Sequence, residues 1–146
     1  GRSVPLSMVR MDRKPESVQV IPESVAITMQ GMLQQVIEAP GGVFRAKVPG
    51  YHVAGKSGTA RKVSSDSRGY RENAYRSLFA GFGPMSNPRY VVLSFSDEPK
   101  TDKGNGAALA ATSAAPMVKE IIARSAPILG VQPSFGENGS ALLVSY

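Results

Sequence analysis

Lys56, Ser57, Gly58 and Thr59 form the stretch of the chain in which residue type and spacing together suggest chemistry. On a strand, the Ser57 and Thr59 hydroxyls would point to one side and could bind a carboxylate, and Arg61 continues the same two-residue period. Gly58 would let the backbone of a ligand lie against the strand. A Lys56 ammonium about 4 Å from a reacting group is worth on the order of 4 kcal/mol at an effective dielectric of 20. We therefore expect an ammonium and two hydroxyls in one groove, with the Thr59 backbone N–H available to an oxyanion.

The same residues also fit a phosphate-binding loop, because residues 50–57 match the pattern G-x-x-x-x-G-K-[ST]. Such a loop opens a helix whose N-terminus faces the phosphate. Gly58 and Thr59 oppose a helix at this point, because glycine costs about 1 kcal/mol there and threonine is β-branched. The pattern favours a strand, and a nucleotide-binding protein is the alternative.

Three extended runs would position the motif. Residues 43–63 contain good strand formers, residues 74–82 follow a polar loop, and residues 89–96 give the strongest strand signal. The short connection at residues 84–88 favours antiparallel neighbours. Glycine is costly inside a strand, so at Gly55 and Gly58 we expect another backbone or a ligand to approach closely. The aromatic residues of the strands, Phe79, Phe82 and Phe95, are expected in the core.

Helical periodicity flanks these runs. Residues 22–38 carry apolar side chains on one helical face, and a second helix is predicted from Ala107 to about Ser125, with a kink or restart at Pro116. Residues 1–22 suggest a short edge strand. The prediction is an α+β fold in which helices flank an antiparallel sheet of three consecutive strands plus a short edge strand. We divide the chain into a body, residues 1–126, and a loosely ordered tail, residues 127–146.

The amino-acid composition excludes some kinds of site but does not identify a function. The 146 residues carry a net charge of +6, which suits an anionic partner. There is no cysteine and a single histidine, so neither thiol chemistry nor a dedicated zinc site is expected. His52 is interpreted as a strand-edge side chain rather than a base. No apolar run is long enough to span a bilayer, and no secretory signal opens the chain.

Lys-Ser-Gly-Thr is a variant of the K-T-G motif of penicillin-binding proteins and serine β-lactamases. The surrounding sequence strengthens the likeness: residues 49–60 and 70–84 resemble two successive strands of class B penicillin-binding proteins, and Asp97-Glu98-Pro99 resembles the end of the following strand. Ser113-Ala114-Ala115-Pro116 resembles the start of the C-terminal helix. The resemblance covers about residues 20–125 and is greatest to the septal (division) transpeptidase of Gram-negative bacteria.

The resemblance implies the C-terminal part of a peptidoglycan D,D-transpeptidase, with a fold like that of the serine β-lactamases. In that family Lys56 and Thr59 would be catalytic, and Ser57, Gly58, Thr59, Arg61, Tyr70 and Tyr75 would contact stem peptides or β-lactams. No cofactor or metal is implied. The other implied partners are the upstream half of the protein and division-complex membrane proteins, not nucleic acid. The implied location is the periplasmic face of the inner membrane, with the anchor outside this chain.

The chain also departs from the family pattern. It contains neither S-x-x-K nor S-x-N, so the nucleophilic serine, its lysine base and the second motif are expected outside these residues. The loop at residues 100–106 lacks an aromatic pair that the nearest family members carry, which affects one wall of the expected pocket. A further alternative is a non-catalytic interaction domain built on the same fold.

Overall fold

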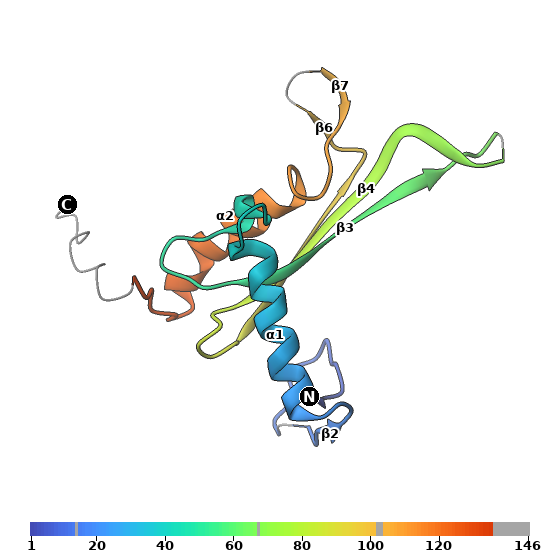
Figure 1. The fold of residues 1–146 in the computed structure, drawn as a ribbon. Coiled ribbons are helices and arrows are strands. Elements are labelled where there is room, and N and C mark those ends of the chain that lie inside the picture. Colours follow the sequence, from blue (N-terminus) through green and yellow to red (C-terminus); the bar gives the residue numbers. More distant parts are fainter. Residues whose placement is uncertain (14, 67, 102–103, 136–146) are drawn as a thin grey trace.

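The computed structural model describes residues 1–135 except 14, 67 and 102–103. Its central sheet consists of β3 (Ala54–Val63), β4 (Tyr70–Gly83) and β5 (Tyr90–Asp97), which are antiparallel in the order β3-β4-β5 (Figure 1). This confirms the predicted three-stranded antiparallel sheet. In the register of the sheet, Ser57 lies opposite Phe79 and Thr59 opposite Ser77.

Two α-helices and a 3-10 turn complete the main body. The helices are α1 (Glu23–Glu38) and α2 (Ala114–Ile128), and the turn is η1 (Phe44–Ala46). The second helix begins seven residues later than predicted, after Ser113, so Pro116 lies in its first turn. Proline is tolerated there because the first N–H groups of a helix have no partner inside the helix. Of the predicted kink or restart at Pro116, the kink was therefore wrong, because the helix begins beside this proline.

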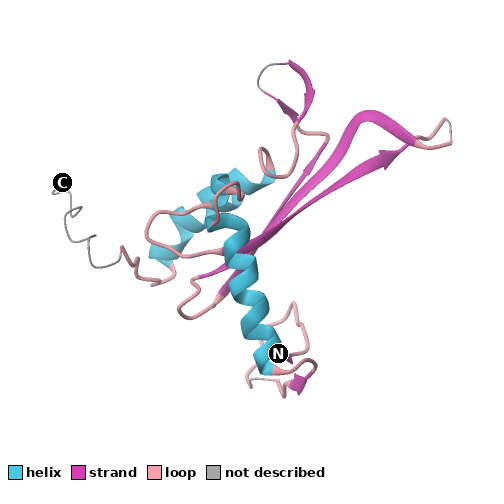
Figure 2. Cartoon of the chain, in the orientation of Figure 1, coloured by secondary structure: helices cyan, strands magenta, loops and turns pink. Residues whose placement is uncertain are grey.

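The short edge strand predicted in residues 1–22 does not join the central sheet. β1 (Arg2–Ser3) pairs with β2 (Val18–Gln19) in a separate two-stranded sheet. A second small hairpin joins β6 (Lys100–Thr101) to β7 (Gly104–Ala107). In the cartoon, β3 and β4 extend beyond both helices (Figure 2).

One face of the sheet carries the hydrophobic core. Phe79 is fully buried there, and it belongs to one cluster with Ile37 of α1 and Val118 of α2. Burial of a side chain of this size stabilises the fold by roughly 1.5–3 kcal/mol. The other members of the cluster are Ala46, Val48, Val53, Ala114 and Ala115.

The opposite face of the sheet is open along β5. Val91, Leu93 and Phe95 alternate on this face, and Phe95 is 54% exposed. The expectation that Phe95 is a core residue was therefore wrong for the described part of the chain. The reason is the strand period: Phe95 stands on the face opposite Ser94, whose hydroxyl meets α2.

The described residues after α2 fold back on the body. The Ser134 N–H donates to the carbonyl of Gly50 at 2.7 Å, and the Tyr51 hydroxyl donates to the carbonyl of Val131 at 3.0 Å. The rest of the predicted tail, residues 136–146, lies outside the described residues. Within the described ranges, no helix has the length and apolar character needed to cross a membrane.

Two glycines give a matched test of the packing. A Cβ at Gly55 would lie 2.7 Å from the carbonyl oxygen of Ala80, whereas nothing lies within 4 Å of a Cβ at Gly31 in α1. Gly55→Ala should lower the free energy of unfolding by about 1–3 kcal/mol through overpacking. Gly31→Ala should raise it by about 1 kcal/mol through helix propensity. Urea unfolding of both variants measures the two signs, and equal effects would contradict the close approach at Gly55.

Candidate functional site

The K-S-G-T stretch lies wholly inside β3, which is an edge strand because β4 is the one strand that pairs with it among the described residues. A helix does not begin at Lys56, so the phosphate-loop alternative lacks the element it requires. Side-chain alternation places Ser57, Thr59 and Arg61 on the face that α2 covers, with Phe79 and Ser77. Lys56 and Gly58 stand on the other face.

The prediction that the ammonium and both hydroxyls face one groove therefore needs correction. Lys56 and the hydroxyls belong to opposite faces and can converge only at the unpaired edge of β3. The Lys56 Nζ does reach back to the strand, where it donates to the carbonyl of Ser57 at 2.9 Å. An extended ligand along this edge would meet side chains from both faces.

The two glycines of β3 have different neighbours. At Gly55 the backbone of β4 approaches closely, which confirms the expectation drawn from glycine inside a strand. At Gly58 an added Cβ would lie 3.1 Å from the side chain of Leu78. The close neighbour at Gly58 is thus a flexible side chain of β4.

Thr59 is exposed, but its hydroxyl has a partner. The Ala110 backbone N–H donates to Thr59 Oγ1 at 3.3 Å. Ala110 precedes α2 and is itself buried. A threonine hydroxyl has one donor and two acceptor positions, so this contact leaves the O–H free to donate.

Arg61 and the two tyrosines lie toward the far end of the β3–β4 hairpin. The Arg61 guanidinium lies over the ring of Tyr70, with its carbon 5.6 Å from the ring centroid. Tyr75 is the register partner of Arg61 and is half-buried, while Tyr70 pairs with Val63 and is exposed. A guanidinium held over an aromatic ring is restricted in position while it keeps its charge.

His52 links the segment before β3 to the first helix. Its Nδ1 lies 2.7 Å from Glu38 Oε1, and Gln34 donates to the other oxygen of Glu38 at 2.9 Å. Burial would raise the pKa of Glu38, but the hydrogen bonds from His52 and Gln34 outweigh it, so the pKa is lowered. The arrangement assigns His52 to packing of α1 against β3.

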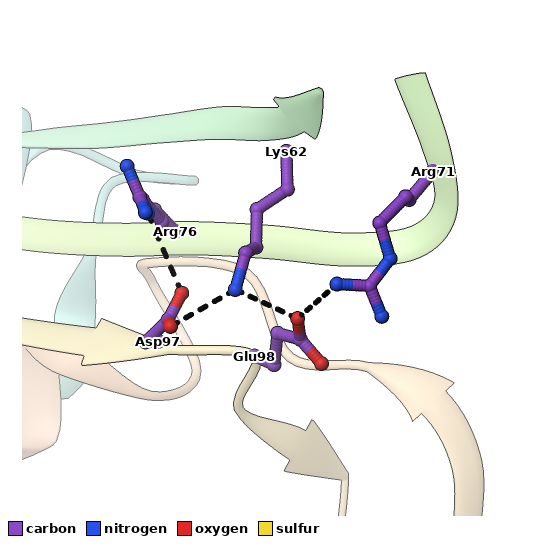
Figure 3. Close-up of polar contacts among 5 residues, drawn as sticks. All are labelled: Lys62, Arg71, Arg76, Asp97 and Glu98. Atoms are coloured by element: carbon purple, nitrogen blue, oxygen red, sulfur yellow. Dashed lines mark hydrogen bonds and ion pairs between the residues drawn. The ribbon is translucent and has the colours of Figure 1, made fainter. Parts of the chain in front are cut away.

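Beyond the motif, a charged network joins all three strands (Figure 3). The Lys62 Nζ lies 3.0 Å from an oxygen of Asp97 and 2.7 Å from an oxygen of Glu98. Arg71 contacts Glu98 at 2.8 Å, and Arg76 contacts Asp97 at 3.5 Å. We call these five residues the hairpin network.

The network shifts three protonation equilibria in the directions expected for paired charges. The Lys62 hydrogen bonds lower the pKa of Asp97 and of Glu98, with further lowering from Arg76 and Arg71 respectively. In return, the hydrogen bonds to Glu98 and Asp97 raise the pKa of Lys62. All three residues are therefore charged near neutral pH.

Sequence reasoning missed the hairpin network, the contact of Ala110 with Thr59 and the buried hydroxyl of Ser77. The alternation of β4 could have indicated Ser77, because it falls between Tyr75 and Phe79 on the covered face. No local pattern indicates Ala110, which is 51 residues from Thr59. The loop at residues 100–106, whose missing aromatic pair is expected to affect one wall of the pocket, lies partly outside the described residues.

Known sequences similar to this chain are transpeptidases. The model of the penicillin binding protein transpeptidase domain matches residues 1–123. The probable peptidoglycan D,D-transpeptidase PbpC of Pseudomonas aeruginosa is 44% identical over 133 residues, which cover 91% of this chain and 22% of that protein. The peptidoglycan D,D-transpeptidase FtsI of Escherichia coli K12 is 36% identical, with 73% of this chain and 18% of that protein covered. The chain thus spans roughly a fifth of these relatives.

Solved structures share the fold. The transpeptidase domain of Burkholderia pseudomallei penicillin-binding protein 3 superposes with a TM-score of 0.77 at 34% identity, covering 91% of this chain and 39% of that one. A Mycobacterium penicillin-binding protein 3 in complex with ampicillin has a TM-score of 0.70 at 28% identity, covering 94% and 31%.

The hairpin network should stabilise the protein only where its groups are charged. Because the pKa values of Asp97 and Glu98 are lower when folded, the contribution is present above about pH 4 and is lost as the pH falls through the folded values. Because the pKa of Lys62 is raised, the contribution is present below about pH 10 and is lost as the pH rises through the folded value. Lys62→Met should lower the melting temperature by about 1–3 °C near neutral pH and low salt.

The matched control is Arg124→Met, which removes the exposed helical pair with Glu120 on α2. That variant should change the melting temperature by less than Lys62→Met does. A thermal unfolding series across pH measures both variants. A Lys62→Met effect that persists unchanged below pH 3 would show that packing, not charge, is the cause.

Proposed function

The chain belongs to the penicillin-binding protein transpeptidase family, and we propose that it supplies one wall of the active site of a peptidoglycan D,D-transpeptidase. The observation that carries the proposal is the position of Lys56, Ser57, Gly58 and Thr59 on the unpaired edge of β3. An edge strand offers backbone groups to an extended peptide, and its side chains supply charge and hydroxyls at the same edge.

The proposed reaction is acyl transfer between stem peptides. A serine hydroxyl attacks the carbonyl carbon of the D-Ala-D-Ala amide, the C–N bond breaks, and the terminal D-Ala leaves with a proton on its nitrogen. An amine of a neighbouring stem then attacks the ester, forms the new amide and returns the serine. We infer that the serine and its lysine base belong to sequence outside these 146 residues, since no S-x-x-K occurs among them.

Lys56 would act by electrostatics at this edge. Its ammonium is exposed and already lies against the backbone of β3, 2.9 Å from the Ser57 carbonyl. A positive charge there would stabilise negative charge that develops when the serine loses its proton. The backbone N–H of Thr59 is the proposed oxyanion donor from this chain.

Three side chains would bind the terminal carboxylate of the stem peptide or the carboxylate of a β-lactam. Ser57, Thr59 and Arg61 share one face of β3 at two-residue spacing. Tyr70 restrains Arg61 through ring contact, and Tyr75 stands opposite Arg61. A carboxylate accepts hydrogen bonds only, so hydroxyl and guanidinium donors suit it. The ampicillin complex of the mycobacterial relative supports β-lactams as ligands.

The cellular setting is proposed by analogy with the relatives. Since the FtsI proteins are peptidoglycan D,D-transpeptidases, the protein would act at the periplasmic face of the inner membrane with an anchor outside this chain. Division-complex membrane proteins and the upstream half of the same protein would be its partners.

Replacing Lys56 tests the proposal directly. In the full-length protein, Lys56→Ala should reduce the rate of acylation by a fluorescent penicillin by about 100-fold or more, because a charge close to the reacting groups is lost. Lys47→Ala removes another exposed lysine, which lies outside β3, and should leave the rate unchanged. The measurement is the time course of covalent labelling on a denaturing gel.

Two results would contradict the proposal. Normal labelling of Lys56→Ala would remove Lys56 from the mechanism. Covalent labelling of the 146-residue chain on its own would mean that a nucleophile lies inside it, against the inference that the serine lies elsewhere.

A further inference from the structure

A buried hydroxyl lies directly beside the motif and takes part in no step described above. Ser77 of β4 is fully buried, and it is the register partner of Thr59. Its hydroxyl donates to the carbonyl of Ala108 at 3.0 Å. A buried hydroxyl without such a partner would cost about 1–3 kcal/mol, so this bond holds the backbone of residue 108 against the sheet.

The same short segment also supplies the partner of Thr59. Ala108 and Ala110 are both buried, and the Ala110 N–H donates to Thr59 Oγ1 at 3.3 Å. Neighbouring hydroxyls on two strands therefore clamp residues 108–110, one by donating and the other by accepting. The Ala108 N–H is also fixed, since it donates to the carbonyl of Pro99 at 3.0 Å.

We propose that Ser77 is a positioning residue for substrate recognition, acting through residues 108–110 to orient the Thr59 hydroxyl. With one lone pair of Thr59 Oγ1 occupied by the Ala110 N–H, the hydroxyl proton points away from that donor and is available to the carboxylate of a substrate. Loss of the Ser77 hydroxyl releases the Ala108 carbonyl, and with it the donor that orients Thr59. The inference rests on the proposed function, because it concerns carboxylate recognition at that site.

Ser94 provides a matched control on the same face. It is nearly as buried as Ser77 and stands on β5 opposite Phe79. Its hydroxyl contacts Met117 Sδ at 3.4 Å instead of the clamped segment. Ser77→Ala and Ser94→Ala thus delete the same atom from similar surroundings, and the Ser77 hydroxyl alone of the two contacts residues 108–110.

The experiment compares acylation of the full-length protein by benzylpenicillin and by its methyl ester, which lacks the carboxylate charge. Ser77→Ala should reduce the acylation rate constant for benzylpenicillin by about tenfold and change that for the ester little, so that discrimination falls. Ser94→Ala should leave the ratio of the two rate constants as in the wild type. Ser77→Cys, which keeps a weak donor of similar size, should fall between wild type and Ser77→Ala and serves if Ser77→Ala does not fold.

A double-mutant cycle tests whether Ser77 acts through Thr59. In a Thr59→Val background, Ser77→Ala should have no further effect on the ratio, because the hydroxyl it orients is gone. Amide hydrogen exchange of residues 108–113 supplies a readout independent of activity. Ser77→Ala should accelerate that exchange by tenfold or more, on the order expected for loss of a buried hydrogen bond, and Ser94→Ala should not.

The outcomes separate the two proposals. An unchanged ratio in Ser77→Ala, equal loss with both esterified and free penicillin, or additive effects with Thr59→Val would overturn the positioning role while leaving the transpeptidase proposal intact. Failure of the wild-type full-length protein to be acylated by either compound would overturn both.

Discussion

In the described part of the chain, β3 pairs with β4 on one side and with no strand on the other, and the candidate site depends on that asymmetry. Along its inner side the strand is fixed in register by β4, from Ala54 opposite Phe82 to Arg61 opposite Tyr75. Its outer side is the edge at which we propose that an extended ligand binds. The register of the pairing decides which side chains flank that ligand, because a shift of one residue would exchange the two faces of the strand.

The register is set by packing of the sheet against the helices. Phe79 is fully buried between the sheet and the helices, and Gly55 and Gly81 leave room for β4 backbone and for Val118 respectively. A side chain at either glycine would meet atoms at 2.7 Å. The core therefore admits this alignment of β3, β4 and α2 and excludes nearby ones. The motif inherits its position from contacts directly beside it, because Gly55 precedes Lys56 and Phe79 is the register partner of Ser57.

The positions of helices and strands could be predicted from the sequence better than the contacts between them. The apolar period of residues 22–38 and the strand signal of residues 89–96 are local. The observed α1 begins one residue later than predicted, and the observed β5 is shifted by one residue at both ends. Phe95 and Pro116 were misjudged because their surroundings depend on which face of the sheet is covered and on where a helix begins. Lys56 and Thr59 lie on opposite faces of β3 because side chains alternate along a strand. The prediction of one shared groove did not take this alternation into account.

Ala110 and the hairpin network lay beyond any local pattern. Thr59 and Ala110 meet only because the chain passes through β4, β5 and the β6–β7 hairpin and returns to the same face of the sheet. Lys62, Arg71 and Glu98 meet because three strand ends converge at the far part of the hairpin. A net positive charge does not indicate which charged side chains will form ion pairs.

Different interactions stabilise two parts of the β3–β4 hairpin. Ion pairs stabilise its far end, and hydrogen bonds between neutral groups stabilise the region around Thr59. At the far end, exposed and half-buried carboxylates and cations form the hairpin network, whose strength depends on pH and ionic strength. Near Thr59, the Ser77 hydroxyl donates a buried hydrogen bond to the carbonyl of Ala108, and the Ala110 N–H donates a part-buried one to the Thr59 hydroxyl. Neither bond involves a group that titrates in the physiological range. On our proposal, the orientation of the Thr59 hydroxyl therefore depends less on pH and ionic strength than the hairpin network does. Low sensitivity to pH and salt suits a site that is proposed to bind a charged carboxylate.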